Sequence, residues 1–214
     1  MAATGVMDFD PLARHYDWME AVTAGSLLQR ARAAWLPALS GCRRVLSAGE
    51  GHGRFAQAFL ERHPHAELTC VDASGRMLER ARRRTRHLPA PPRWVHAAVP
   101  AWRPEPAVYD VIVTCFFLDC FPPAHLASVV EALAASATDR SAWLVVDFAL
   151  PARGLARWRA RAIHSGMYAF FRAAVDLPAA VLTPPDALLR AHGFRLDGRR
   201  EYSWGLVRAD LWRR

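Results

Sequence analysis

The amino-acid sequence predicts an α/β fold, a doubly wound sheet of mainly parallel strands with helices on both faces. Short apolar runs without polar alternation recur after residue 41, as expected of parallel strands that are covered on both faces. Segments with a helical pattern fill the gaps between most of these runs, and right-handed crossovers through such helices give a doubly wound sheet. The length of 214 residues suits one domain with a sizeable core.

The elements of the central part follow from the spacing of the apolar residues. Strands are expected at residues 43–48, 67–72, 93–97, 109–115 and 142–148. Helices are expected between most of them, at about residues 53–63, 74–86 and 123–137.

The two ends of the chain have a different pattern. Residues 9–37 are expected to form one or two helices before the first strand, and residues 152–173 a longer helix. For the next helix, Thr183 is a candidate N-cap, Pro184 would open the helix and Gly193 would close it. Two strands around a short loop follow within residues 194–212, and strands joined so closely must pair antiparallel.

Composition sets limits on the class of protein. The net charge is +8, and all 28 basic residues are arginine, so we interpret the charge as a compositional bias rather than as a nucleic-acid surface. No apolar run reaches the ~20 residues of a membrane helix. The N-terminal residues do not follow the pattern of a signal peptide, so a cytoplasmic protein is expected. His63 and His65 have no cysteine or carboxylate cluster beside them, and we expect no metal site.

A glycine-rich loop follows the first strand in VLSAGEGHGRFA, residues 45–56. Its glycines are Gly49, Gly51 and Gly53, whereas a dinucleotide loop of the pattern G-x-G-x-x-G would need its third glycine at Arg54. Asp72 ends the second strand, and a carboxylate there can accept both ribose hydroxyls of an adenosine. The alternative is that Asp72 caps the following helix, although Ser74 could fill that role.

The order of VLSAGEGHGRFA, LTCVDASGRML, YDVIVTCFFLDCF, WLVVDF, LLRAHGF and a terminal hairpin resembles class I S-adenosylmethionine-dependent methyltransferases. The segments FDPLARHYDWMEAVTAGSLLQRARAAWL and FFRAAVDLPAAVLTPPDALLRAHGF are similar to the quinone-type subgroup of small-molecule enzymes. The resemblance implies a Rossmann-like, seven-stranded sheet with an antiparallel last strand. It also implies methyl transfer from S-adenosyl-L-methionine to a small apolar or aromatic molecule, with S-adenosyl-L-homocysteine as product.

The resemblance divides the single domain, residues 1–214, into four parts. They are an N-terminal helical lid (9–37), a cofactor-binding core (43–149), a helical cap or substrate segment (150–183) and a C-terminal helix with hairpin (184–214). It places the methionine part of the cofactor over Gly49 and Gly51. The residues that it implies for cofactor binding are Tyr16, Ser47, Ala48, Gly49, Glu50, Gly51, Asp72, Ala73, Met77, Ala97, Ala98, Val99, Cys115 and Phe116.

Two positions depart from the family pattern. Ser47 stands where the family usually has an acid that orders the glycine loop and the cofactor's amino group. Glu50 either replaces that acid or is an exposed loop residue. Ala98 stands where an aspartate often binds the adenine amino group, so a backbone carbonyl or a nearby side chain would have to accept that bond. These losses leave open a weakly binding or non-catalytic protein of the same fold.

Two side chains are candidates for catalysis. Asp119 follows the fourth strand in an apolar setting that could raise its pKa, which suits a general base, although it could instead be a helix N-cap. His164 lies on the helix that is expected to cover the pocket, and it is either a base or a core or surface histidine. An amino-methylating nucleic-acid enzyme would carry an Asn/Asp-Pro-Pro-aromatic motif where this chain has CFFLDCF. We therefore expect a small-molecule acceptor, no nucleic acid, and a monomer or homodimer.

Overall fold

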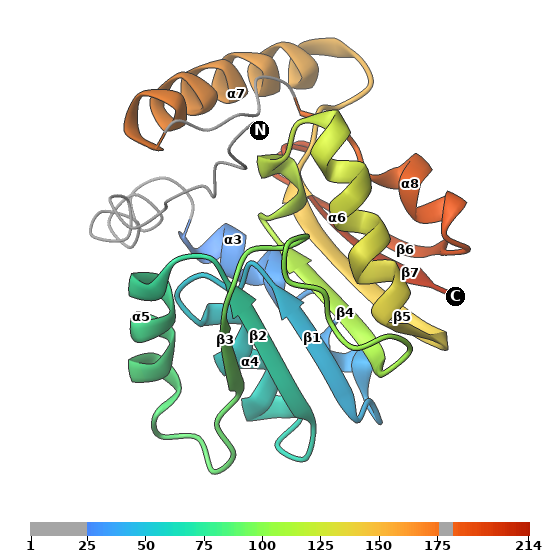
Figure 1. Cartoon of the computed structure of the whole chain (residues 1–214). Coiled ribbons are helices and arrows are strands. Elements are labelled where there is room, and N and C mark those ends of the chain that lie inside the picture. The colour runs from blue at the N-terminus through green and yellow to red at the C-terminus, as the bar shows by residue number, and fades with distance from the viewer. Residues whose placement is uncertain (1–24, 176–181) are drawn as a thin grey trace, which may run out of the picture.

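A computed structural model of the chain describes residues 25–175 and 182–214, with side chains described for 26–166 and 182–214. Seven strands form one sheet in the order β3-β2-β1-β4-β5-β7-β6 (Figure 1). Their bounds are Arg44–Ala48 (β1), Glu67–Asp72 (β2), Arg93–His96 (β3), Tyr109–Cys115 (β4), Ala137–Phe148 (β5), Arg195–Tyr202 (β6) and Val207–Arg213 (β7). Strands β1 to β5 pair in parallel, and β7 pairs antiparallel with both β5 and β6. The predicted fold class, including the antiparallel last strand, is confirmed.

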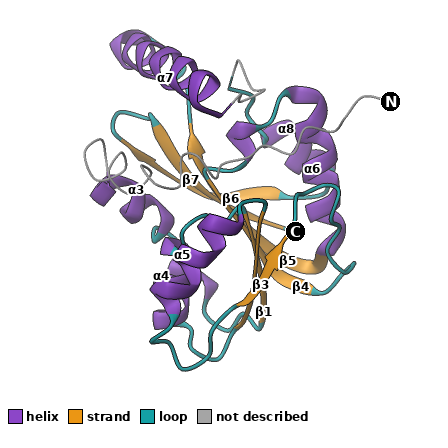
Figure 2. Ribbon diagram, turned by 60° about the vertical axis from the view of Figure 1, so that its left-hand side comes forward, coloured by secondary structure: helices purple, strands orange, loops and turns teal. Residues whose placement is uncertain are grey.

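Helices cover both faces of the sheet, as predicted. They are α3 (Gly25–Arg32), α4 (Arg54–Arg62), α5 (Gly75–Thr85), α6 (Pro123–Ser136), α7 (Gly154–Val175) and α8 (Asp186–Ala191), with the short 3₁₀ helices η1 (Leu36–Leu39) and η2 (Leu118–Cys120). Helices α3, α4 and α5 lie on one face, and α6 and α8 lie on the other (Figure 2). Helix α7 lies beyond the ends of the strands (Figure 1).

The sheet is covered by helices on both faces. Because successive strand residues point to opposite faces, neighbouring residues of a strand are buried in two different clusters. On the side of α3 and α4, Val111 and Leu144 pack with Phe59. On the side of α6, Ile112 and Trp143 pack with helix and loop residues. All five of these side chains are almost completely buried, which explains why the strands read as apolar runs without alternation.

Two element boundaries differ from the prediction. Strand β5 begins at Ala137, directly after α6, and not at residue 142. Ala137 pairs with Tyr109, and an irregularity precedes the pairing of Ala142 with Val111. Helix α8 begins at Asp186 with Pro185 as its N-cap, so Thr183 is not the cap and Pro184 does not open the helix. A residue before proline is disfavoured in the helical conformation, and this keeps Pro184 outside the helix.

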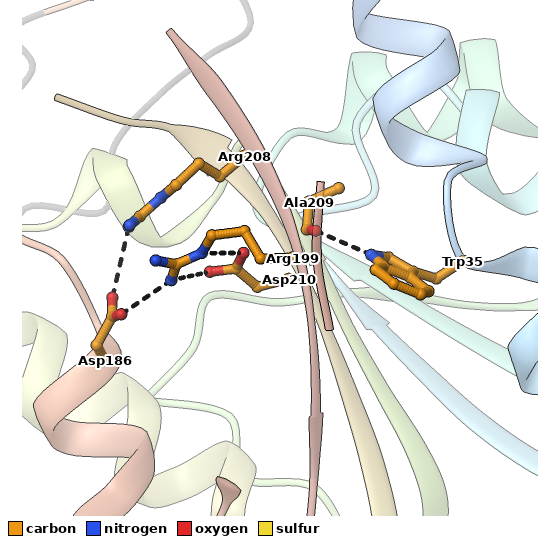
Figure 3. Close-up of polar contacts among 6 residues, drawn as sticks. All are labelled: Trp35, Asp186, Arg199, Arg208, Ala209 and Asp210. Carbon is orange, nitrogen blue, oxygen red and sulfur yellow. Dashed lines mark hydrogen bonds and ion pairs between the residues drawn. The ribbon is translucent and has the colours of Figure 1, made fainter. Parts of the chain in front are cut away.

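The N-terminal segment that was predicted to be a lid is described only from residue 25 onward. Leu28, Ala31 and Leu36 are buried in the core, so this part of the segment belongs to the core. The indole Nε1 of Trp35 donates a hydrogen bond to the carbonyl oxygen of Ala209 at 2.8 Å (Figure 3). The remainder of the predicted lid, residues 9–24, lies outside the described part of the chain.

The third glycine of the loop allows α4 and α5 to pack closely. Gly53 is the N-cap of α4 with φ of +85°, and a Cβ there would lie 2.8 Å from the Cα of Ala81 in α5. Gly53 thus allows a close contact between two helices, whereas the third glycine of a dinucleotide loop allows a helix to pack on a strand. Gly51 also has a positive φ, of +64°, but nothing lies within 4 Å of a Cβ built on it.

Gly53→Ala is therefore expected to destabilise the protein more than Gly51→Ala. Both substitutions bear the left-handed backbone cost of roughly 1–2 kcal/mol. Only Gly53→Ala adds the collision with α5, and overpacking of this kind costs typically about 1–3 kcal/mol more. Urea denaturation of the two variants measures the difference, and equal losses of unfolding free energy would contradict the packing role.

Candidate functional site

The carboxyl ends of β1 and β2 carry loops that are bonded to each other. The Gly49 N–H donates to the Val71 carbonyl oxygen at 2.9 Å. The Gly51 N–H donates to Asp72 Oδ2 at 2.8 Å, and the Ser74 N–H donates to Asp72 Oδ1 at 2.8 Å. Ser74 Oγ accepts from the Met77 N–H and caps α5. The interpretation of Asp72 as the helix cap is therefore wrong, since its carboxylate bridges the glycine loop to the start of α5.

Glu50 supplies the carboxyl group that the first strand lacks at Ser47. The Ser47 hydroxyl donates to Glu50 Oε2 at 2.5 Å, and the Ala56 N–H donates to Oε1 at 2.9 Å. Glu50 is 8% exposed, so it is not an exposed loop residue. Burial raises the pKa of Glu50 from 4.5 to about 7, although the hydrogen bonds from Ser47 and Ala56 and the charge of Arg32 oppose this.

Arg32 of α3 is a residue of this site that the sequence did not reveal. It is 5% exposed, and its guanidinium carbon lies 4.9 Å from the ring centroid of Phe116, at the end of β4. Its charge lowers the pKa of both Glu50 and Cys115, which places it beside the glycine loop. Arginine is so frequent in this chain that no pattern distinguishes Arg32 from the others.

Aromatic side chains surround the end of β4. Phe116 has a left-handed backbone, with φ of +55°, and its ring lies 5.3 Å from that of Phe148. The ring of Phe117 packs so closely on Gly49 that a Cβ there would collide with it. Phe148 in turn meets His164 of α7 edge-on at 5.9 Å. The glycine loop thus has an aromatic surface beside it.

The two predicted catalytic residues are both buried. Asp119 lies in η2 and is 8% exposed, and α6 is preceded by Pro122 at its N-cap, so Asp119 is not the helix cap. Burial raises the pKa of Asp119 to about 6, opposed by a weak hydrogen bond from the Cys120 thiol. His164 is 6% exposed, and burial lowers its pKa below 6.5, which favours the neutral imidazole at pH 7.

A small pocket lies between residues of β5 and β7 and the segment 182–185, and polar residues form much of its wall. It is lined by Asp119, Val145, Asp147, Phe148, Leu182, Thr183, Pro184, Pro185, Arg208 and Asp210. Asp147 Oδ1 accepts from the Phe117 N–H at 3.0 Å. The sequence gives no separate signal for Asp147, because this aspartate lies within the apolar run WLVVDF.

Arg208 and Asp210, which line this pocket, belong to an ion-pair network (Figure 3). Arg199 donates from Nε and Nη2 to the two carboxylate oxygens of Asp210, at 2.8 and 2.7 Å, and from Nη2 to Asp186 at 3.1 Å. Arg208 approaches the other oxygen of Asp186 at 3.5 Å. Each guanidinium therefore has a carboxylate partner, and the network fixes α8 against β6 and β7.

The remaining predicted cofactor residues lie at the same edge of the sheet, apart from Tyr16, which is outside the described residues. Ala48 ends β1, Ala73 follows β2 and Cys115 ends β4. Ala97, Ala98 and Val99 follow β3, and the Ala97 N–H donates to the Asp72 carbonyl oxygen. The Ala98 carbonyl oxygen accepts from the Trp102 N–H, which leaves it one lone pair for an adenine amino group. Met77 is buried in the first turn of α5.

Within the described ranges, no cluster of three or more His, Cys, Asp or Glu side chains could hold a metal ion. A separate search of the helices in those ranges finds none with the length and apolar character needed to cross a membrane.

Residues 45–140, which contain the glycine loop, match a protein family described as a methyltransferase domain. The predicted fold, that of class I S-adenosylmethionine-dependent methyltransferases, is confirmed, and the segment with the glycine loop and Asp72 is similar to a methyltransferase domain. No curated protein matches the sequence.

Solved structures of methyltransferases share the fold at low sequence identity. Mitomycin 7-O-methyltransferase is 20% identical with a TM-score of 0.68, and the match covers 99% of this chain and 62% of that one. Magnesium protoporphyrin IX methyltransferase from Synechocystis PCC 6803, with bound S-adenosylhomocysteine, is 20% identical with a TM-score of 0.68. The match covers 99% of this chain and 95% of that one. The 1,6-didemethyltoxoflavin-N1-methyltransferase from Burkholderia thailandensis is 19% identical with a TM-score of 0.67, and the match covers 96% of this chain and 85% of that one. This chain therefore spans less than two thirds of the first enzyme and most of the other two.

Proposed function

We propose that this protein transfers a methyl group from S-adenosylmethionine to a small-molecule acceptor. The observation that carries the proposal is the pair of carboxyl groups at the glycine loop. Glu50 and Asp72 both bond to the loop or its flanks, and the charge of Asp72 raises the pKa of Glu50, which shows that they are close. Such a pair favours a cationic ligand and disfavours the diphosphate of a dinucleotide.

The residues at the edge of the sheet fit this cofactor. The space above Gly51 is open, so a ligand can approach the backbone there. We assign Asp72 to the ribose hydroxyls, Glu50 to the amino group and Arg32 to the carboxylate of the amino-acid part. When bound, the cofactor supplies an electrophilic methyl group and its own leaving group. The protein then has to orient the acceptor, exclude water and accept a proton where one is released.

For the acceptor we propose a molecule with an aromatic or apolar part, which the rings near Phe116 and Phe148 can contact. The names of the similar structures give mitomycin, 1,6-didemethyltoxoflavin and magnesium protoporphyrin IX as their acceptors. Asp119 is the proposed base, because a buried carboxyl group with a pKa near 6 is mostly ionised at pH 7 and can take a proton. His164 is the second candidate, since burial keeps its imidazole neutral.

Calorimetry with the full chain tests the proposal. S-adenosylhomocysteine is expected to bind, and NAD⁺ is expected not to. NAD⁺ binding without S-adenosylhomocysteine binding would contradict the proposal. If S-adenosylhomocysteine binds, its formation from S-adenosylmethionine in the presence of small aromatic acceptors measures the transfer. RNA or DNA as the better acceptor would favour the nucleic-acid alternative, and binding without transfer to any acceptor would favour the non-catalytic one.

A further inference from the structure

Helix α7 exposes its large apolar side chains and buries smaller or polar ones. Leu155 is 83% exposed and Trp158 is 72% exposed, whereas Ala160 and His164 are almost completely buried. Leu155, Trp158 and the exposed Ala162 follow the i, i+3, i+7 spacing of one helix face. Helix α7 lies at one end of the molecule (Figure 2), and this face is turned away from the sheet. An exposed apolar face of this kind is typical of an interaction surface.

The turn between β6 and β7 adds a second exposed indole beside this face. Trp204 is 73% exposed, and the backbone of Ser203, Trp204 and Gly205 has positive φ of 51°, 58° and 77°. A bulky residue in the left-handed region is rare because its backbone is strained. Arg159 of α7 donates to both oxygens of Ser203 at 3.0 Å, and its guanidinium carbon lies 5.5 Å from the Trp204 ring centroid. The turn and α7 therefore form one surface.

The charge around these apolar side chains is positive. Residues 148–175 contain five arginines and no acidic residue. Four of these arginines have described side chains, none with a carboxylate partner within the described ranges: Arg153, Arg157, Arg159 and Arg161. By helical geometry, Arg159 and Arg161 lie on either side of the apolar face of α7. Glu201 approaches Gly205 of the turn, but the surface as a whole is basic.

We propose that this surface, formed by Leu155, Trp158, Trp204 and the arginines around them, docks on an anionic lipid bilayer. Indole rings are favoured at the level of the lipid headgroups, and an aliphatic side chain can reach the boundary of the acyl chains. Arginine stems cover apolar surface while their guanidinium groups extend to lipid phosphates. Helix α7 then lies in the plane of the interface, as a peripheral contact.

Two other occupants fit this surface less well. A second copy of the chain would bring like charges together across the contact, which disfavours association. A nucleic acid can pair with the arginines and stack on the indoles, but it offers no apolar partner to Leu155. The inference goes beyond the proposed methyl transfer, because docking requires neither cofactor nor acceptor. His164 on the buried side of α7 meets Phe148, so docking would bring the proposed acceptor site close to the lipid.

Co-sedimentation of the full chain with lipid vesicles tests the inference. Vesicles of phosphatidylcholine alone are compared with vesicles that contain about one third phosphatidylglycerol, an anionic lipid. The chain is expected to bind the anionic vesicles at least about tenfold more tightly, and the affinity should fall as salt is added. Equal binding to the two kinds of vesicle, or no binding to the anionic ones at low salt, would overturn the proposal.

Trp204→Gly separates lipid binding from the stability of the fold. Glycine adopts the φ of +58° without strain, so the variant should keep its unfolding free energy. Its affinity for anionic vesicles should nevertheless fall at least about tenfold, because a large apolar side chain is removed from the contact. Leu155→Ser should also lower the affinity, whereas Leu196→Ser, at a partly exposed leucine near the start of β6, is the control and should not.

A pair of double variants tests the part played by charge. Arg153→Gln/Arg161→Gln is expected to weaken binding to anionic vesicles at least about tenfold. Arg62→Gln/Arg195→Gln removes the same charge at the end of α4 and the start of β6, away from the turn, and should stay within about twofold of wild type. Equal losses in the two double variants would mean attraction by net charge alone and would overturn the proposed surface.

The other occupants give different results. A wild-type dimer in light scattering that Trp158→Ala makes monomeric would assign the surface to a second copy. Tighter binding to single-stranded RNA than to anionic vesicles, weakened by the same substitution, would assign it to nucleic acid. Either result would overturn the lipid proposal. The substitutions lie outside the residues proposed to bind the cofactor, so unchanged binding of S-adenosylhomocysteine confirms that each variant retains that site.

Discussion

Asp72→Ala is expected to weaken binding of S-adenosylhomocysteine by about 1.5–3 kcal/mol, or roughly 10- to 150-fold in Kd. The carboxylate is proposed to accept the ribose hydroxyls, and it also holds the Gly51 and Ser74 N–H groups in place. Because these contacts concern the nucleoside part, 5′-methylthioadenosine should lose affinity to a similar degree. Calorimetry with both ligands measures the effect, and Asp72→Asn, which keeps one acceptor oxygen, should lie between wild type and Asp72→Ala.

Arg32→Gln provides a contrast with the Asp72 variant. It removes the charge proposed to bind the carboxylate of the amino-acid part, a part that 5′-methylthioadenosine lacks. S-adenosylhomocysteine should bind about tenfold more weakly or worse, whereas 5′-methylthioadenosine should be almost unaffected. Arg200 is the control, because its guanidinium also lies over an aromatic ring, that of Trp35 at 4.4 Å, but on the far strand of the hairpin. If Arg32→Gln weakened both ligands equally, its effect would come from the fold of the site and not from the carboxylate.

Glu50→Gln is expected to change how stability depends on pH. The pKa of Glu50 is raised from 4.5 to about 7 in the folded protein. The stability that protonated Glu50 contributes is therefore fully present below pH 4.5 and is lost as the pH rises through 7. Relative to Glu50→Gln, the wild type should therefore lose on the order of 3 kcal/mol of unfolding free energy between these limits. The amide can accept from the Ala56 N–H and donate to Ser47 Oγ, so the variant should fold.

Urea denaturation at several pH values between 5 and 8.5 measures this difference. Glu67→Gln is a suitable control, because the Glu67 side chain is 78% exposed. Its difference from wild type should stay nearly constant over the same range. A Glu50→Gln difference that is also constant would mean that the buried carboxyl group is ionised throughout, and the assignment of its raised pKa would be wrong.

The sheet could be predicted because its physical requirements leave a local trace. A strand covered on both faces is apolar at most positions, so runs such as 109–115 stand out. The boundaries were less accurate where two elements meet without a loop, as at Ala137, since no turn residue marks the change. At Pro184 and Pro185, two prolines shifted the helix start to Asp186.

The glycine loop and the acidic candidates were suggested by their places at the ends of strands. The glycine loop, Asp72 and Asp119 all come directly after apolar runs, and parallel strands bring such positions to one edge. Arg32 and Asp147 were missed for different reasons. Arg32 reaches the glycine loop from a helix that precedes the sheet, and its place depends on tertiary packing. Asp147 lies inside a strand, and nothing local shows that its side chain lines a pocket.

The position of β7 has a consequence for the synthesis of the chain. β7 lies between β5 and β6 and pairs Val207 with Phe148, so β5 keeps an open edge until residues 207–213 have been translated. The anchor of Trp35 on Ala209 must also wait, across 174 residues. At about 5–20 residues per second, the ribosome needs several seconds to go from the end of β5 to the end of β7. During that interval a long apolar strand can pair with neighbouring nascent chains, so the rate of translation between residues 148 and 207 affects how much of the protein reaches its native sheet.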